Sequence, residues 1–318
     1  MVTREDIISA YRLLLNREPE SEAAIEGHMY IDNWQQLRHI FMASPEYRYS
    51  SGYLDRWMVA PIFGDTMLLW VNMKDKYCSI HCVMDAYEPD SSNVVRQLLR
   101  RGDTFLDIGA NIGWFTMLAS SIVGETGYVH SFEPQPIIAR YLRRSIDLNG
   151  LAARVRLHEV GVWHHHGSMS LGWHEDAENH GASYLMPEGA ESSAGSNVEL
   201  LTLDSLNLDR VDMIKIDVEG AEAKAMQGAE RLLARHRPII LSELHAVQLP
   251  VVSAVNCSEY VQQMEQRGYR CLGLRGEEAG RFLSSATISV QGFTDVLFVP
   301  EEKTERALHD LFPQPPNA

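Results

Sequence analysis

The segment FLDIGANIGWF, residues 105–115, joins an apolar run to a turn that contains two glycines. The run FLDI has the character of a buried strand, and the residues from 112 to 122 predict a helix. Asp107, Gly109 and Gly113 stand at the turn in the pattern DxGxxxG. Glycines there let the backbone approach a ligand closely and leave the helix N-terminus open. The segment therefore predicts a ligand-binding strand–helix junction at the carboxyl edge of a parallel sheet.

Strand and helix patterns alternate along most of the chain after this junction. Their lengths and apolar strands are typical of a parallel sheet that is covered by helices on both faces. We therefore predict an α/β fold with a doubly wound, mainly parallel sheet. The predicted strands are 104–108, 127–133, 155–159, 211–217, 238–244 and 293–299. The predicted helices are 91–102, 112–122, 136–150, 222–235 and 258–268.

The N-terminal residues have a different sequence pattern. Residues 1–57 contain short amphipathic helical patterns, three of them opened by Ser21, Asn33 or Ser44, which are good N-cap residues. We predict a small all-α domain over 1–57 and a larger domain over 58–318. The stretch 66–83 at the start of the larger domain predicts two strands around a polar turn at Lys74–Lys76.

Composition limits the class of protein. The chain has 318 residues, is 45% hydrophobic and carries a net charge of −15, which disfavours a nucleic-acid partner. It has no apolar run long enough for a membrane span, and its first residues lack the apolar core of a secretion signal. We expect a cytoplasmic protein whose four cysteines are free thiols. The oligomeric state stays open.

The ligand expected at the junction follows from its acid. The common dinucleotide pattern GxGxxG is absent, since Asn111 stands between the two glycines of the turn. Asp107 would repel a pyrophosphate but suits a cationic or zwitterionic ligand such as S-adenosylmethionine. Glu133 follows Gly113 by twenty residues, at the end of the next strand, where a carboxylate can accept both ribose hydroxyls.

Several motifs in order resemble the FkbM-type methyltransferases, over about residues 85–300. They are YEP (87–89), FLDIGANIGWFT, FEPQP, TLDSL (202–206), IKIDVEGAEAKAMQGAE and ILSELH. The resemblance implies a seven-stranded, Rossmann-like class I fold and S-adenosylmethionine-dependent methylation of a hydroxyl, often on a sugar or a polyketide. The small N-terminal domain resembles helical domains attached to bacterial glycan-related proteins, which also favours a carbohydrate acceptor.

The resemblance also implies further contacts with the ligands. Glu159 and Val160 lie where the adenine is expected, and Tyr87 and Glu88 lie where the cofactor pocket would close. The long polar segment 172–197 is expected to shape the acceptor pocket. The substrate-contact candidates in it are His174, Asn179, His180 and Ser183.

Chemistry on the acceptor is assigned to two strand ends. Asp217 closes one predicted strand, and Glu243 and His245 close the next, so all three should meet at the carboxyl edge. Asp217 or His245 is expected to take the hydroxyl proton, with Glu243 orienting the acceptor. A Mg²⁺ ion on Asp217 and Glu243 is the alternative, but two acids are fewer ligands than such a site usually needs.

Three neighbours of Asp217 have less specific roles. Lys215 lies on the same side of the strand and is expected to pair with an acid or to contact substrate. Glu222 is expected in the first turn of the following helix, where the helix dipole favours an acid. Glu219 could reach either the substrate or the helix start.

The run VWHHHG, residues 162–167, resembles a metal site only in composition. Its histidines do not match a compact zinc motif, and no cysteine is near, so a turn between two strands is the better interpretation.

Two other function classes remain open from the residues alone. One is a nicotinamide-dependent oxidoreductase on a Rossmann-like sheet, against which the missing GxGxxG counts. The other is a non-catalytic binding module in which the helical domain does the binding.

Overall fold

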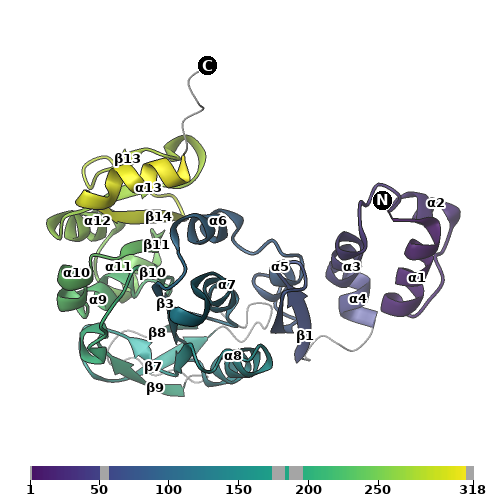
Figure 1. Ribbon diagram of the computed structural model, residues 1–318, viewed down its shortest axis with the longest axis horizontal. Helices are drawn as coiled ribbons and strands as arrows, with labels where there is room; N and C mark the ends of the chain where they lie inside the picture. The colour runs from purple at the N-terminus through teal and green to yellow at the C-terminus, as the bar shows by residue number, and fades with distance from the viewer. Residues whose placement is uncertain (1, 51–56, 174–182, 186–195, 313–318) are drawn as a thin grey trace. The chain divides into compact units, whose positions relative to one another are not determined.

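The computed structural model describes residues 2–50, 57–173, 183–185 and 196–312, and the chain divides into two compact units (Figure 1). The first unit comprises Met1–Tyr87 and Asp176–Gly181. The second comprises Glu88–Glu175 and Ala182–Ala318. Each unit is described by itself.

The first unit begins with the predicted short helices. Thr3 opens α1 with a capping box in which its side chain and that of Asp6 each accept the other residue's backbone N–H. The side chains of Ser21 and Asn33 cap α2 and α3 as predicted, and Ser44 accepts the amide of Tyr47 at the start of α4. The helices are α1 (Arg4–Leu15), α2 (Glu22–Glu26), α3 (Trp34–Ala43) and α4 (Pro45–Ser50).

The strand predicted after Lys76 is wrong. β2 (Met67–Asn72) pairs with the preceding β1 (Trp57–Ile62), and the segment SIHCV forms the helix α5 (Ser79–Val83) instead. Asp75 explains the difference, because its carboxylate accepts the amides of Tyr77 and Cys78 and so turns the chain into a helix. The domain boundary predicted near residue 57 falls between the helices and this hairpin, inside the first unit.

The second unit is built on one large sheet, as predicted. Its strand order is β13-β12-β14-β11-β10-β3-β4-β5, and the five strands from β11 to β5 are parallel. The sheet has eight strands rather than seven because the two-residue β13 adds an edge. The bounds are β3 (Thr104–Ile108), β4 (Tyr128–Phe132), β5 (Val155–His158), β10 (Met213–Ile216), β11 (Ile239–His245), β12 (Tyr269–Gly273), β13 (Phe282–Leu283) and β14 (Phe293–Pro300).

Helices cover both faces of the large sheet, with α9, α10 and α12 on one side and α6, α7 and α8 on the other (Figure 1). The helix predicted over 222–235 is two helices that meet at Gly228. A Cβ on Gly228 would lie 2.2 Å from the carbonyl oxygen of Trp163, so the close approach of the segment that follows Val162 requires glycine. The helices are α6 (Pro89–Leu98), α7 (Trp114–Val123), α8 (Pro136–Leu148), α9 (Glu222–Gln227), α10 (Glu230–His236), α11 (Gln248–Val252), α12 (Cys257–Gln266) and α13 (Thr304–Leu311).

A smaller sheet in the same unit has the order β6-β9-β7-β8. His164–His166 form the bend between β6 and β7, which agrees with the predicted turn between strands. The bounds are β6 (Gly161–Val162), β7 (Gly167–Trp173), β8 (Ser183–Leu185) and β9 (Ser196–Leu201).

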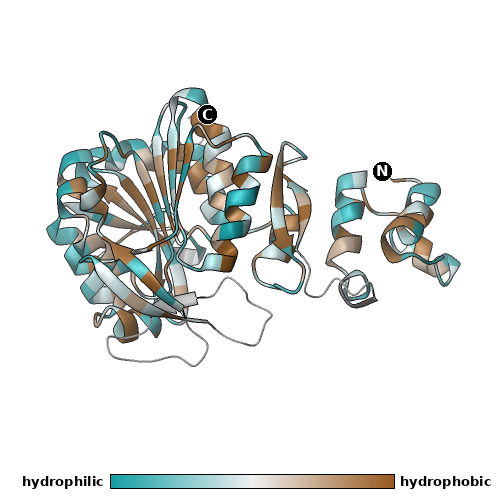
Figure 2. Ribbon diagram, turned by 90° about the horizontal axis from the view of Figure 1, so that it is seen from below, coloured by the Kyte–Doolittle hydropathy of each residue, from teal (hydrophilic) through white to brown (hydrophobic). Residues whose placement is uncertain are grey.

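Apolar side chains on the central strands form the core of the second unit, and these strands are largely hydrophobic in Figure 2. The four cysteines are buried, as predicted. Within the described residues, every helix is too short or too polar to cross a membrane.

Candidate active site

The DxGxxxG segment forms the junction between β3 and α7. Asp107 lies near the end of β3 with its side chain fully buried, and its Oδ2 accepts a 2.6 Å hydrogen bond from the hydroxyl of Thr116 on α7. Its other oxygen, Oδ1, is buried and has no hydrogen-bond partner. Burial raises the pKa of Asp107, while the positive charge of Lys215 acts in the opposite direction. The junction therefore presents a buried acid with one acceptor oxygen unused.

Glycine is required at the first turn position by sterics. Gly109 has φ +81°, and a Cβ there would lie 1.8 Å from the carbonyl oxygen of Asp217. The turn thus packs directly against the end of β10, the strand next to β3. This contact brings the cofactor motif and the predicted catalytic strand together at one edge.

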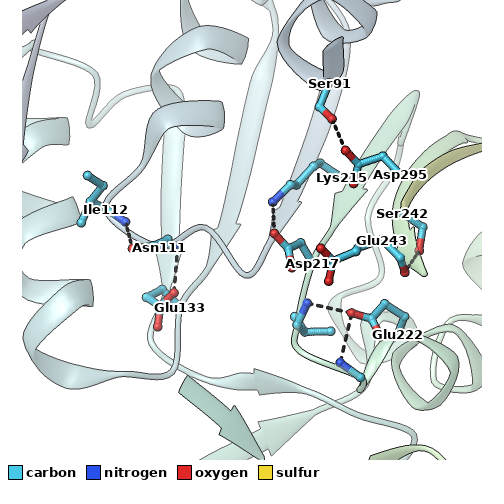
Figure 3. Close-up of polar contacts among 12 residues, drawn as sticks. Ser91, Asn111, Ile112, Glu133, Lys215, Asp217, Glu222, Ser242, Glu243 and Asp295 are labelled. Carbon is cyan, nitrogen blue, oxygen red and sulfur yellow. Dashed lines mark hydrogen bonds and ion pairs between the residues drawn. The ribbon is translucent and has the colours of Figure 1, made fainter. Parts of the chain in front are cut away.

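Glu133 closes β4 beside the same turn. Its carboxylate accepts the backbone amide of Asn111 at 2.9 Å (Figure 3). It also accepts the amide of Gln135 at 2.9 Å, and its side chain is almost fully buried. Burial raises the pKa of Glu133 to about 7, although the two amide hydrogen bonds favour the ionised form. Asn111 has φ +51°, so the backbone bends to aim its amide at this carboxylate. Glu133 is held rigidly at the position predicted for ribose recognition.

These residues fit the cofactor predicted from the sequence. The free oxygen of Asp107 is an acceptor for an ammonium group, and the Glu133 carboxylate is an acceptor for hydroxyls. The hydrogen bonds that the described residues make to these two carboxylates come from the Thr116 hydroxyl and from backbone amides, so both groups keep their negative charge available to a ligand. The donor and acceptor set matches S-adenosylmethionine in charge.

Lys215 and Asp217 form an ion pair at the end of β10. The ammonium Nζ lies 3.0 Å from Asp217 Oδ2 (Figure 3). It also lies 4.9 Å from the ring centre of Phe115. Lys215 is 5% exposed, whereas the Asp217 side chain retains 26% exposure. Burial opposes the charge of Lys215, yet Asp217, Glu88 and Asp107 surround it and leave its pKa raised. Lys215 therefore provides a permanent cation at Asp217.

More acids lie around this pair than the sequence indicated. Burial, followed by the negative charges of Asp217, Glu219, Glu222 and Asp295, raises the pKa of Glu243 to about 10. Burial also raises the pKa values of Glu219 and Glu222 to about 7. Like charges crowded in a partly dry site cannot all ionise, so burial and the neighbouring acids favour the protonated form of Glu243 at neutral pH.

Glu222 lies in the first turn of α9, as predicted, but is not a surface acid. It is fully buried, and its Oε1 accepts the amides of Val218 and Gly220 at 2.9 and 3.4 Å. Its Oε2 is buried without a partner. Glu219 has φ +52° and accepts a 2.7 Å hydrogen bond from Gln248. The side chain of Glu222 thus holds the backbone of the segment that carries Glu219.

His245 has a capping role that the sequence did not reveal. Its Nδ1 lies 3.2 Å from the amide nitrogens of Val247 and Gln248 at the start of α11, and both amides donate to it. A neutral ring in this arrangement carries its proton on Nε2. His245 therefore offers a hydrogen-bond donor rather than a free basic nitrogen.

The structure gives the surroundings of some of the other residues that were predicted to contact the cofactor or the acceptor. Glu159 is paired with Arg143 on α8, and Val160 packs against the core, so adenine contacts there stay predictions. Tyr87 ends the first unit and Glu88 begins the second, where it acts electrostatically on Lys215. His174, Asn179 and His180 lie outside the described residues, as does the side chain of Ser183.

Sequence reasoning missed Asp295, Ser91 and Thr116. Asp295 on β14 is opposite Glu243 in the strand register and accepts a 2.9 Å hydrogen bond from Ser91 on α6. An antiparallel pairing between distant strands leaves no local signal. Thr116 lies one turn into α7, on the face toward the sheet, and helical spacing from Gly113 could have identified it.

The alternative of a metal ion at this edge concerns Asp217 and Glu243. In the parts of the chain that the structure describes, no group of three or more His, Cys, Asp or Glu side chains is arranged to hold a metal ion. Lys215 already supplies a cation at Asp217. A metal on Asp217 and Glu243 stays an untested alternative.

Comparison with known proteins identifies the family of this chain. Residues 107–271, which run from Asp107 to β12, match the model of the Methyltransferase FkbM domain. The chain belongs to the FkbM methyltransferase family. This membership confirms the resemblance and the methyltransferase class, and it counts against an oxidoreductase.

Relatives of this FkbM-family chain share only part of their length with it. "Methyltransferase 1" of Beauveria bassiana is 29% identical over 152 residues, which cover 40% of this chain and 59% of the relative. "31-O-demethyl-FK506 methyltransferase FkbM" of Streptomyces tacrolimicus is 28% identical over 177 residues, 47% of this chain and 68% of the relative. The chain thus spans about three-fifths of the length of the first of these curated relatives.

Solved structures similar to this family member match it at low identity. One is a putative rRNA-methylase from Clostridium thermocellum, with TM-score 0.42 and 15% identity, covering 66% of this chain and 94% of that chain. Another is Methyltransferase FkbM from Methylobacillus flagellatus, with TM-score 0.40 and 16% identity, covering 92% of this chain and 58% of that chain.

Proposed function

We propose that this chain is an S-adenosylmethionine-dependent O-methyltransferase that acts on a hydroxyl of a sugar or of a glycosylated or polyketide metabolite. The main support for this proposal is the close packing of the turn at Gly109 against the backbone carbonyl of Asp217. This packing places the turn predicted to bind the cofactor beside Asp217. The carboxylate of Asp217 is paired with Lys215 and is still partly exposed. The name of one relative specifies a 31-O-demethyl compound, which is an oxygen acceptor.

Cofactor binding is assigned to the β3–α7 junction and the end of β4. Asp107 and the turn through Gly113 would hold the methionyl part, Glu133 the ribose, and residues 159–161 the adenine. When bound, S-adenosylmethionine supplies an electrophilic methyl group on a sulfonium. The side chains around it act by alignment and by excluding water.

Asp217 is the proposed base. Lys215 binds its Oδ2 and leaves Oδ1 to accept the proton of the acceptor hydroxyl as the oxygen–hydrogen bond breaks. His245 is less suited to this step, because its Nδ1 already accepts two amides. Protonated Glu243 would instead donate a hydrogen bond that orients the acceptor, and His245 Nε2–H would do the same.

A transfer assay with labelled methyl groups tests this assignment. The acceptors are a panel of sugars, glycosides and polyketides, and bound S-adenosylhomocysteine is measured in parallel. D217N should lower kcat by about 10²–10⁴ while binding of S-adenosylhomocysteine is retained. H245Q should cost much less, and the exposed E125Q should match wild type.

Other outcomes would contradict the proposal at different levels. Full transfer by D217N would overturn Asp217 as the base. Transfer that persists after both Asp107→Ala and Glu133→Ala would overturn the cofactor site. Thermal stabilisation by NAD, with none by S-adenosylmethionine, would replace the methyltransferase by an oxidoreductase.

A further inference from the structure

A pocket lies away from the proposed active site, where β4 and β5 begin rather than where they end. Its volume is about 580 Å³, which is in the range of small-molecule sites. It is bounded by the second half of α8, by residues 152–154 and by the first residues of the two strands. The polar side chains that line it are Tyr128, His130, Arg143, Asp147, Arg154 and Arg156.

Three guanidinium groups in one pocket are unusual in a chain whose net charge is −15. Arg143 is paired with Glu159. Arg154 and Arg156 form no side-chain hydrogen bond or ion pair within the described residues, although acids outnumber bases in the chain by 43 to 28. The guanidinium groups of Arg154 and Arg156 are therefore not paired with an acid among the described residues.

Arg154 adds a stronger sign of a missing partner. Its Nε atom is buried and has no hydrogen-bond acceptor. A buried donor without an acceptor costs about 1–3 kcal/mol, and more when the group is charged. An acceptor that enters the pocket would recover this cost.

His130 lines the pocket and can contribute hydrogen bonds to a ligand rather than a positive charge. His130 Nδ1 lies 3.1 Å from His158 Nε2 on the neighbouring strand. Burial and the charge of Arg156 lower the pKa of His130, and burial, His130 and Arg156 lower that of His158 to about 4. Among the described residues that line the pocket, Asp147 is the one that carries a carboxylate.

We propose that this pocket binds the phosphate group of a small phosphorylated metabolite. The planar guanidinium fork matches phosphate oxygens in geometry, and several arginines can share one such group. Arg154 and Arg156 contact the phosphate, and Arg143 can rotate toward it from its exposed pair with Glu159. Asp147 and the exposed ring of Tyr128 remain for the rest of the ligand.

Calorimetric titration with inorganic pyrophosphate tests the site, at low and constant ionic strength and with S-adenosylhomocysteine present throughout. Pyrophosphate carries no sugar or base, so an acceptor or adenine site would not recognise it. Wild type should bind with Kd below about 1 mM, and added salt should weaken the binding. R154A and R156A should each raise Kd by about tenfold.

Arg140 provides the matched control. It lies on α8 near the pocket, carries the same charge, and does not line the pocket. R140A should bind as wild type does. R154A and R156A should melt no lower than wild type, because neither guanidinium group has a hydrogen-bond partner among the described residues. No binding by wild type, equal loss in all three variants, or competition with S-adenosylhomocysteine would overturn the proposal.

Discussion

Burial of Glu133 should make its predicted contact with the cofactor ribose depend on pH. The neutral acid and the carboxylate are equally populated near pH 7, because burial raises the pKa of this group to about 7. Ribose hydroxyls need the carboxylate as acceptor. Ligand binding therefore favours the ionised form and must displace a proton at lower pH.

Binding of methylthioadenosine, which keeps the ribose but lacks titrating amino and carboxyl groups, should report this proton. Its Kd should be constant above about pH 8 and should rise below pH 7, by up to about tenfold per pH unit. E133Q should bind weakly and without this dependence, and E125Q should behave as wild type. A flat profile in wild type would show that Glu133 does not contact the ribose.

Substitution of Gly109 by alanine tests the packing of the β3–α7 turn, and the same substitution at Gly150 is a control with a similar backbone conformation. Both have positive φ, +81° and +65°, but a Cβ on Gly150 would have no atom within 4 Å. G150A should cost about 1 kcal/mol of unfolding free energy, from the backbone alone. G109A should cost several times more, since its Cβ would overlap the Asp217 carbonyl. Urea unfolding measures both, and equal costs would contradict the packing of the turn on β10.

At the scale of elements, β10 ends in a charge network that depends on one cation. Lys215 faces Asp217, Glu88 and Asp107, and it is nearly inaccessible to water. K215M should destabilise the fold by about 3–5 kcal/mol, because it leaves buried acids unpaired. Adding D217N should recover part of the loss.

Arg306 is the comparison for this variant, since its pair with Asp310 is 75% exposed on the arginine side. R306M should change the unfolding free energy by less than about 1 kcal/mol. If K215M cost as little, the ion pair at the end of β10 would have no structural role. Chemical unfolding of the three variants in one buffer gives the values.

The sequence was informative about elements whose signals are local. The strand–helix periodicity located β3, α7, β4 and α8, and the glycines of DxGxxxG located the turn, because chain geometry imposes both. It failed at α5, where the Asp75 hydrogen bonds outweighed the strand-like residues, and at β12, which lies between a helix and a loop.

The candidate site was likewise predictable where the signal is local and unpredictable where it depends on tertiary packing. Asp107, Glu133, Asp217 and Glu243 were assigned to the carboxyl edge, because parallel strands end together. The protonation of Glu243 and the cap made by His245 could not be predicted. Each depends on neighbours from β14 or α11, and their approach is decided by packing across the whole sheet.

At the scale of the molecule, the acids of the site should make stability depend on pH. The pKa values of Glu133, Glu219 and Glu222 are raised to about 7 and that of Glu243 to about 10, mainly by burial. An acid whose pKa is raised in the folded state stabilises the fold at low pH, and this contribution is lost as pH rises through the folded value.

The four acids dominate the pH dependence between pH 6.5 and 8.5. Unfolded histidines titrate near pH 6.5, so His130 and His158, whose pKa values are lowered in the fold, add a smaller contribution of opposite sign at the lower end of the range. Cysteine ionisation begins only near the top of the range. The unfolding free energy should fall by about 2–5 kcal/mol across it, as measured by urea unfolding at constant ionic strength. E243Q should reduce this slope by up to about 1.4 kcal/mol per pH unit, whereas E125Q should leave it unchanged. A slope that is the same in E243Q would mean that Glu243 is ionised in the folded protein, and Glu243 could then not donate the hydrogen bond assigned to it.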